Sequence, residues 1–224
     1  MKIIFTVFIA IIVLGGAYFV VAPYLQPGTL QTSGEQPSVE VTTARVQENS
    51  AGYTIDVSYP QFGIPAIDLQ IKKAIDDSVA EFKTSPPNPG DSAMPKYSFD
   101  GSFDSVYVGP DVISVKLILS QYTGGAHPLT LISGLNYDRT TGGRLLQSDA
   151  FAMLGLSVGE VSAAATAELK AKLGDTMFME GADTNPENFS SFVISADKIT
   201  FIFQQYQVAA YAAGPQEVSF ARKP

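Results

Sequence analysis

A serine between two glycines is the part of this sequence that comes nearest to a catalytic motif. Residues 155–159 read Gly-Leu-Ser-Val-Gly, the G-x-S-x-G pattern that sets a nucleophilic serine on a strained turn after a strand. Residues 149–154 are not typical of a strand, and the only histidine, His127, precedes the serine, whereas that fold orders serine, acid, histidine. Because Glu160 follows Ser157 by three residues, we favour a helix capping box here.

The second group of candidates surrounds His127, in the segment Tyr-Thr-Gly-Gly-Ala-His-Pro at residues 122–128. Gly124 and Gly125 lack a Cβ and admit positive φ, so a partner can approach their backbone closely. The proline at 128 restricts His127 to extended conformations. One interpretation is a ligand-facing loop in which the imidazole forms a hydrogen bond near Tyr122. The other, which we favour, is a tight internal turn that His127 holds down by bonding to backbone.

Two tyrosines near the C-terminus flank the short segment Gln-Val-Ala-Ala. A tyrosine ring offers apolar area with a polar tip, which suits stacking on a sugar or packing in a protein interface. Each ring could equally lie at the rim of the core with its hydroxyl bonded. The candidate ligand-binding residues are Tyr122, Gly124, Gly125, His127, Tyr206 and Tyr211.

Acidic and metal-binding chemistry has weaker support. Asp100 and Asp104 could act as paired acids or as calcium ligands, but they lie in a Gly- and Ser-containing stretch where solvated side chains are the ordinary outcome. With no cysteine and one histidine, the sequence offers no structural zinc site. No acidic residue flanks His127 at metal-ligand spacing. We therefore expect no metal, no cofactor and no catalytic residue.

Residues 3–22 form a nearly unbroken apolar run preceded by Lys2. A helix rises about 1.5 Å per residue, so about 20 residues cross the hydrocarbon core. We expect residues 1–24 to be an uncleaved signal-anchor with its short N-terminal end inside the cell. A cleaved signal peptide and a cytosolic core helix are the alternatives, although Pro23 is a poor residue at a scissile bond.

The rest of the chain is acidic. The whole-chain net charge of −8 becomes −9 for residues 25–224, because Lys2 is excluded. Such a surface repels nucleic-acid phosphates and anionic lipid headgroups, so we expect no nucleic-acid partner and contact with the bilayer only through residues 3–22. The absence of cysteine excludes a disulfide framework and thiolate chemistry.

The elements that position these residues follow from periodicity. Residues 25–37 are rich in Pro, Gly, Ser, Thr and Gln and predict a flexible stalk. Residues 39–46 and 53–59 predict two strands joined by a hairpin loop, since the second alternates strictly between apolar and polar residues. Pro65 opens a predicted helix. Its buried stripe, at three- to four-residue spacing, is Ile67, Ile71, Ile75, Val79 and Phe82.

Residues 84–95 predict an irregular loop because they contain four prolines. Further strands are predicted, with 112–121 central in a sheet, together with a hairpin turn at 139–143 and a helix from Ser157 to Gly174. This order predicts an α+β fold, an antiparallel sheet with two main helices packed on one face. We expect one compact ectodomain with an N-terminal part, 38–121, and a C-terminal part, 122–221. The predicted strands are 97–103, 105–108, 112–121, 129–138, 191–196, 199–205 and 217–221.

Residues 38–221 resemble the paired domains of unknown function in RsiV-like bacterial envelope proteins. The matching pieces are the segment 122–127, the hairpin 136–142 with the residues that follow it to Phe151, and the segment from Phe201 to Val218. The family includes the extracellular part of a lysozyme-sensing anti-sigma factor and the non-catalytic N-terminal region of some peptidoglycan deacetylases. Residues 39–83 match only in their strand–strand–helix order.

The resemblance implies a cell-envelope location, with the C-terminal domain outside a single membrane span, and a cell-wall glycan or a lysozyme-like protein as ligand. Two departures limit it. Ala210 stands where the family commonly has proline before Tyr211. Only Met1 and Lys2 precede the apolar run, whereas an anti-sigma factor needs a cytoplasmic segment to bind its sigma factor.

The sequence therefore favours a membrane-anchored, extracytoplasmic binding or sensing module that is not an enzyme. One alternative is an enzyme acting on envelope polymers, either a hydrolase or a deacetylase-associated protein, which would need a real Ser157 or His127 constellation. The other is a structural envelope subunit that works through association with other proteins.

Overall fold

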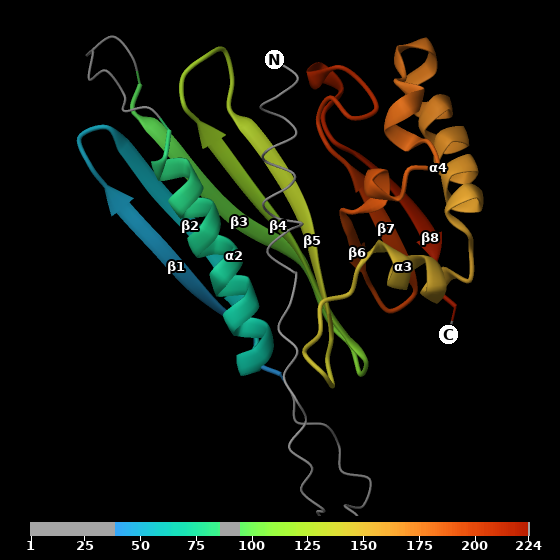
Figure 1. The fold of residues 1–224 in the computed structure, drawn as a ribbon, viewed down its shortest axis with the longest axis horizontal. Helices are drawn as coiled ribbons and strands as arrows, with labels where there is room; N and C mark the ends of the chain where they lie inside the picture. The colour runs from blue at the N-terminus through green and yellow to red at the C-terminus, as the bar shows by residue number, and fades with distance from the viewer. Residues whose placement is uncertain (1–38, 86–94, 224) are drawn as a thin grey trace, which may run out of the picture. The chain divides into compact units, whose positions relative to one another are not determined.

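A computed structural model of the protein describes residues 39–85 and 95–223 (Figure 1). Residues 41–224 form one compact unit, built from two β-sheets with helices. The fold is mixed α+β. The predicted signal-anchor, residues 1–24, and the predicted stalk, residues 25–37, lie outside the described residues.

The first sheet has five strands in the order β1–β2–β3–β4–β5. Neighbours pair antiparallel except β2 and β3, which pair parallel. The prediction of a wholly antiparallel sheet was therefore wrong at this pair. A parallel pair needs a long crossover between its strands, and α2 supplies part of it. The strands are β1 Thr42–Asn49, β2 Tyr53–Gln61, β3 Tyr97–Val108, β4 Val112–Tyr122 and β5 Leu129–Asp138.

Helix α2, Pro65–Lys83, covers one face of this sheet. Proline occupies its first turn, as predicted, and Ile67, Ile71, Ile75 and Phe82 are buried. Phe82 stacks on Phe99 of β3 with ring centroids 5.4 Å apart. The predicted buried stripe is thus confirmed except at Val79, which is half-buried while its neighbour Ser78 is buried.

Strand β3 joins two segments that were predicted as separate strands, 97–103 and 105–108. Its register against β4 shifts between Asp104 and Tyr107, and Ser105 has a φ of 51°. A bulge of this kind inserts a residue and bends the strand without ending the pairing. Asp104, which the prediction left between the two strands, is therefore the start of a bulge within one strand.

The second sheet has three antiparallel strands, β6 Phe192–Ile194, β7 Lys198–Phe203 and β8 Gln216–Ala221. Helices α3, Gln147–Leu154, and α4, Val158–Leu173, pack with it around a core rich in phenylalanine. The buried rings of this core are Phe189, Phe192, Phe201 and Phe203. Four short 3-10 helices lie in the connections: η1 Gly174–Thr176, η2 Met179–Ala182, η3 Pro186–Phe189 and η4 Tyr211–Ala213.

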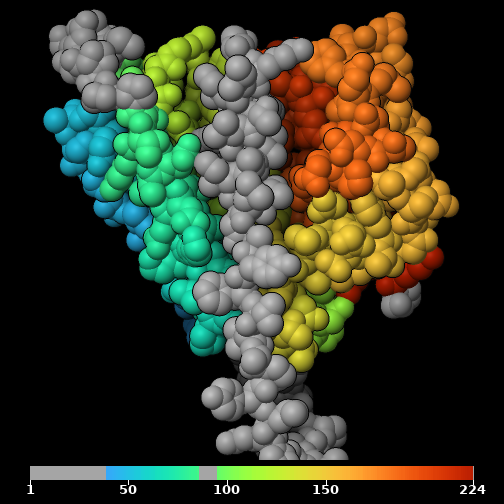
Figure 2. Space-filling model, in the orientation of Figure 1, coloured from blue at the N-terminus to red at the C-terminus, as the bar shows by residue number. Residues whose placement is uncertain are grey.

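Two predictions about the helices need correction. The two main helices do not share one face of one sheet: α2 covers the five-stranded sheet, whereas α4 packs against β8 and the core of the three-stranded sheet. In Figure 2 the teal atoms of α2 and the yellow-to-orange atoms of α3 and α4 accordingly lie on opposite sides of the view. Helix α3 was not predicted, because eight residues are too few to establish a helical period.

The two sheets meet on the face of the first sheet that points away from α2. Strand β6 lies across β4 and β5 there. The Ser114 hydroxyl donates to Asn136 Oδ1 at 2.6 Å and accepts from the backbone N–H of Ile194 at 2.9 Å. The Asn136 side-chain amide donates to the carbonyl oxygen of Phe192 at 2.7 Å. Fully bonded buried polar groups such as these fix the relative position of the two sheets.

Side chains also close the outer edge of β5. The Gln204 amide accepts from the N–H of Ile132 at 3.0 Å and donates to its carbonyl oxygen at 2.7 Å. Ser191 Oγ accepts from Gly134 N–H at 3.3 Å, and Arg144 donates to the Gly134 carbonyl at 2.8 Å. In this way the amide of one glutamine takes the place of a neighbouring strand.

Among the described residues, no helix is by itself long and apolar enough to cross a bilayer. The segments 147–154 and 158–176 meet the length and composition criteria only as a pair bent by 87°.

Candidate functional site

Three aromatic side chains that the sequence singled out lie together in the structure. His127, in the loop between β4 and β5, stacks on Tyr211 with ring centroids 3.8 Å apart and planes inclined by 21°. Tyr206 completes the group, with its ring centroid 5.5 Å from that of Tyr211 and its hydroxyl 3.4 Å from Nε2 of His127. We call His127, Tyr206 and Tyr211 the aromatic cluster.

The hydrogen bonds of His127 indicate which ring nitrogen is protonated. Nδ1 lies 3.0 Å from the carbonyl oxygen of Pro128, and a carbonyl can only accept, so Nδ1 must be the donor. In the neutral ring Nε2 is then an acceptor, and the Tyr206 hydroxyl donates to it. The oxygen of Tyr206 keeps its lone pairs for a further partner.

Tyr122 braces the loop that presents His127. Its hydroxyl donates to the carbonyl oxygen of Gly125 at 3.3 Å. Gly124 and Gly125 have φ values of 94° and 106°, which residues with a Cβ rarely adopt. The two glycines therefore serve the turn itself. They contribute to the cluster by setting where His127 lies.

The cluster is accessible to solvent. Tyr206 is 47% exposed, His127 is exposed and Tyr211 is half-buried. Tyr206 has a φ of 66°, an uncommon conformation for a residue with a side chain. A turn closed by Gln204 and Gln207, whose N–H donates to the Gln204 carbonyl at 3.0 Å, encloses it. A strained residue held in place by its surroundings is a frequent feature of functional sites.

The serine of the G-x-S-x-G segment has the structural role that the sequence predicted. Ser157 caps α4: its hydroxyl accepts from the N–H of Glu160 at 3.3 Å and donates to the Glu160 carboxylate at 2.7 Å. Hydrogen bonds from the Ser157 backbone and then from its side chain lower the pKa of Glu160. Within the described residues, His127 and Ser157 form no hydrogen bond with each other.

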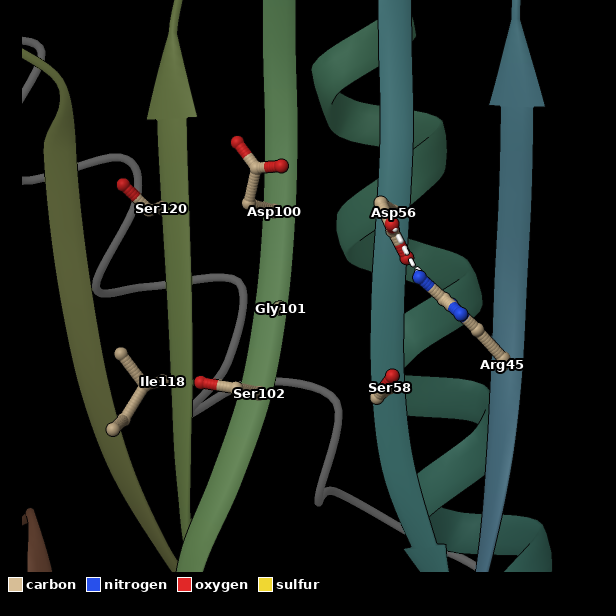
Figure 3. Close-up of a pocket in the computed structure, with 8 residues that line it drawn as sticks. All are labelled: Arg45, Asp56, Ser58, Asp100, Gly101, Ser102, Ile118 and Ser120. Carbon is tan, nitrogen blue, oxygen red and sulfur yellow. Dashed lines mark hydrogen bonds and ion pairs between the residues drawn. The ribbon is translucent and has the colours of Figure 1, made fainter.

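A shallow hollow of about 290 Å³ lies on the open half of the first sheet, on the face away from α2 (Figure 3). Its lining residues come from β1 to β4 and are mostly short polar side chains. They are Arg45, Asp56, Ser58, Asp100, Gly101, Ser102, Ile118 and Ser120.

The hollow has one cationic side chain, Arg45, and two carboxylates, Asp56 and Asp100. Arg45 donates to both oxygens of Asp56, at 2.7 and 2.6 Å, and these bonds hold the pKa of Asp56 below its ordinary value. Asp100 pairs directly with Asp56 across the parallel strands. Within the described residues its carboxylate has no hydrogen bond or ion pair. The hollow therefore has a net negative charge.

The sequence named Asp100 but not the hollow. A signal was present, because β2 and β3 each place small polar residues at every second position, which marks one face of a strand. What the sequence lacked was the order of the strands, and above all the parallel pairing of β2 with β3. The described residues contain no group of three or more His, Asp or Glu side chains placed to bind a metal ion.

Two segments of the chain match known family models. Residues 46–130 match the family model described as deacetylase PdaC, and residues 157–223 match the model described as a protein of unknown function, DUF3298. The first match begins within β1 and extends through β4 and the loop with His127, and the second covers α4 to β8. The aromatic cluster therefore brings together residues from both matched segments.

One curated relative extends across both segments. The chain is 26% identical over 198 residues to the peptidoglycan-N-acetylmuramic acid deacetylase PdaC of Bacillus subtilis strain 168. The alignment covers 86% of this chain and 42% of that protein. The chain thus corresponds to less than half the length of this relative.

Solved structures show a similar fold. A DUF3298 family member from Bacteroides fragilis superimposes with a TM-score of 0.56 at 19% identity, over 82% of this chain and 90% of that one. A DUF3298 family protein from Pseudomonas aeruginosa gives 0.53 at 15% identity, over 84% and 96%. At these identities the likeness concerns the fold alone.

Proposed function

We propose that this protein is a non-catalytic binding module of the bacterial cell envelope and that its aromatic cluster binds glycan strands. The apolar run at residues 3–22 would anchor it in the cell membrane with residues 41–224 outside. The resemblance to RsiV-like ectodomains supports this proposal. The name of the Bacillus subtilis relative also supports it, because peptidoglycan contains a glycan polymer.

The observation that carries the proposal is the exposed stack of His127 on Tyr211, flanked by Tyr206. Sugars present C–H faces that pack on aromatic rings and hydroxyls that bond to polar tips, and tyrosine supplies both. The Tyr206 hydroxyl has a free acceptor position once it donates to His127.

The side chains support binding better than catalysis. A serine hydrolase needs its nucleophile within hydrogen-bond reach of a base, and the Ser157 hydroxyl is occupied by helix capping. Both ring nitrogens of His127 already have partners, Nδ1 the carbonyl oxygen of Pro128 and Nε2 the Tyr206 hydroxyl. An enzyme acting on envelope polymers is the alternative, and turnover of a muropeptide that His127→Ala abolishes without lowering Tm would establish it.

The test is calorimetric titration of the full chain, kept in non-ionic detergent, with tetra-N-acetylchitotetraose. Stacking on one aromatic side chain contributes about 1 kcal/mol beyond area burial. Because Tyr211→Ala also removes the buried ring area, it should weaken binding at least about tenfold with Tm unchanged. Tyr206→Phe keeps the ring and should weaken it about threefold through the lost hydrogen bond.

Tyr107→Ala removes a tyrosine of β3, outside the cluster, and serves as the matched control. Equal losses for Tyr107→Ala and Tyr211→Ala would contradict the assignment of the site. Binding of a lysozyme in place of the oligosaccharide, abolished by Tyr211→Ala, would make the ligand a protein and overturn the glycan assignment.

A further inference from the structure

The hollow on the open half of the first sheet has the chemistry of a sugar site. Ser58, Ser102 and Ser120 provide hydroxyls on three neighbouring strands, and Ile118 adds a small apolar surface (Figure 3). Short hydroxyl side chains donate and accept, so they match the hydroxyls of a saccharide. Their small size leaves the sheet face accessible to an extended ligand.

The charge of the hollow selects among saccharides. Arg45 is bound to Asp56 through two hydrogen bonds. Lys116, a second cation of this face, is bound to Glu217 at 2.7 Å and lies 3.7 Å from Asp104. Both cations are thus neutralised by carboxylates, while Asp100 is not, and the chain as a whole is strongly acidic. A ligand with a positive charge complements this surface, and an anionic one is repelled.

The hollow adjoins the loop that presents the aromatic cluster. Ser120 pairs with Asp100, and Tyr122 pairs with Ser98, on the same two strands. Tyr122 is two residues beyond Ser120, so both side chains lie on one face, roughly 6.7 Å apart along the strand. Tyr122 bonds to Gly125 of the loop that presents His127, so a chain of sugar units that continues from the cluster past Tyr122 would reach Asp100.

We propose that the hollow is a second subsite of the glycan surface, selective for a sugar unit with a free ammonium group, as in a de-N-acetylated amino sugar. The ammonium lies against Asp100, and Ser102 and Ser120 bind the ring hydroxyls. This inference rests on the proposed function, because it extends the same glycan-binding surface. It adds the class of sugar that the surface prefers.

The experiment compares two tetramers on the full chain at low salt: chitotetraose, in which every unit has an amine, and tetra-N-acetylchitotetraose, which has none. At mildly acidic pH the amines are protonated and ordinary carboxylates are ionised. A charge-assisted hydrogen bond should make chitotetraose bind about tenfold tighter. Asp100→Asn should remove that advantage and leave the acetylated tetramer bound as before.

Asp76→Asn is the matched control, since it removes the same charge from an exposed position on α2, which packs on the other face of the sheet. An equal loss in this variant would mean that general electrostatics attract the amine, which overturns the subsite. Tetralysine binding as tightly as chitotetraose, with the same dependence on Asp100, would overturn the sugar assignment.

The two proposals fail differently. Equal affinity of the wild-type chain for both tetramers, with Tyr211→Ala abolishing each, retains the glycan module and removes the amine subsite. Binding of chitotetraose alone, lost in Asp100→Asn and unaffected by Tyr211→Ala, retains the subsite and removes the role of the aromatic cluster.

Discussion

The five-stranded sheet presents one face, the face away from α2, to two different surroundings. Over β4 and β5 this face is covered by the second sheet and its polar groups are buried and bonded. Over β1 to β3 and the Ile118 to Ser120 part of β4 it is open and forms the hollow around Asp100. Polar side chains on one face of the sheet thus join the two sheets in one half and, in our proposal, bind a ligand in the other.

A polar residue in a strand must therefore be interpreted together with its neighbours across the sheet. Ser114 and Ser120 are both on β4, on the same face. Ser114 is fully buried and forms two hydrogen bonds with other buried groups. Ser120 is half-buried and bonds to Thr130 at 3.2 Å. Substitutions in the covered half should therefore change stability, and those in the open half should change binding.

The largest effect is expected at Gly134, where β5 passes directly under β6. A Cβ placed there would overlap the carbonyl oxygen and backbone of Phe192. Because backbone cannot move aside as a side chain does, Gly134→Val should lower the free energy of unfolding by about 4 kcal/mol or more. Urea titration measures this loss.

Gly159→Ala is the control for Gly134→Val. Gly159 lies in the first turn of α4, with only Ser157 Oγ within 4 Å of the added carbon, at 3.9 Å. It should stabilise the protein by up to about 1 kcal/mol. A Gly134 variant as stable as the wild type would show that the sheets are not in close contact in solution.

A smaller loss of stability is expected from breaking the buried hydrogen bonds of Asn136 between the two sheets. Asn136→Ala leaves the Phe192 carbonyl without its donor and the Ser114 hydroxyl without its acceptor. Unbonded buried groups cost about 1–3 kcal/mol each, so we expect a loss of roughly 2–4 kcal/mol in chemical denaturation. Ser102→Ala, in the open half, should stay within about 0.5 kcal/mol. Similar losses for both variants would remove the distinction between the halves.

At the boundary between the two halves, substitutions should change the free energy of unfolding only slightly. Lys116, whose side chain is only 14% exposed, forms an ion pair with Glu217 of β8 at 2.7 Å. Glu217 is 44% exposed, so solvent screens the pair and its coupling energy should not exceed about 1 kcal/mol. A double-mutant cycle with Lys116→Met and Glu217→Gln measures it. A coupling above about 2 kcal/mol would place this pair among the buried contacts between the two sheets.

The smallest effect concerns pH. Arg45 lowers the pKa of Asp56 in the folded protein. A carboxyl with a depressed folded-state pKa adds stability above its unfolded pKa of about 3.9, and this is lost as pH falls through the folded value. Asp56→Asn should therefore reduce stability slightly at neutral pH and not at the lowest pH. The loss of stability in Asn136→Ala should not depend on pH, because the side chain that it removes has no charge. The check is denaturation of both variants across the acidic range.

Much of the fold could be predicted from the sequence because local patterns encode it. Pro65 and the isoleucines at four-residue spacing predict α2, and alternation predicts the β1–β2 hairpin. The direction of pairing between β2 and β3 could not be predicted, since alternation describes faces and not partners. For the same reason one sheet was expected where there are two.

The candidate residues could be named from the sequence but not assembled. Tyr206 and His127 are separated by 79 residues, and no local pattern relates positions so far apart. Ser114 and Asn136, polar residues within otherwise apolar strands, were the signal of a second sheet packed on the first. Such residues are expected to bond to something when they are buried, and that rule would have indicated a covering element.

The Gln204 amide at the edge of β5 has a consequence for how copies of this protein meet at high concentration. An unpaired strand edge is a template to which another molecule can add a strand. Here the outward groups of Ile132 are already bonded to Gln204, so at this position β5 offers no free group to a foreign strand. Gln204→Ala would reopen this edge, and concentrated samples of that variant should aggregate at temperatures where the wild type stays dispersed.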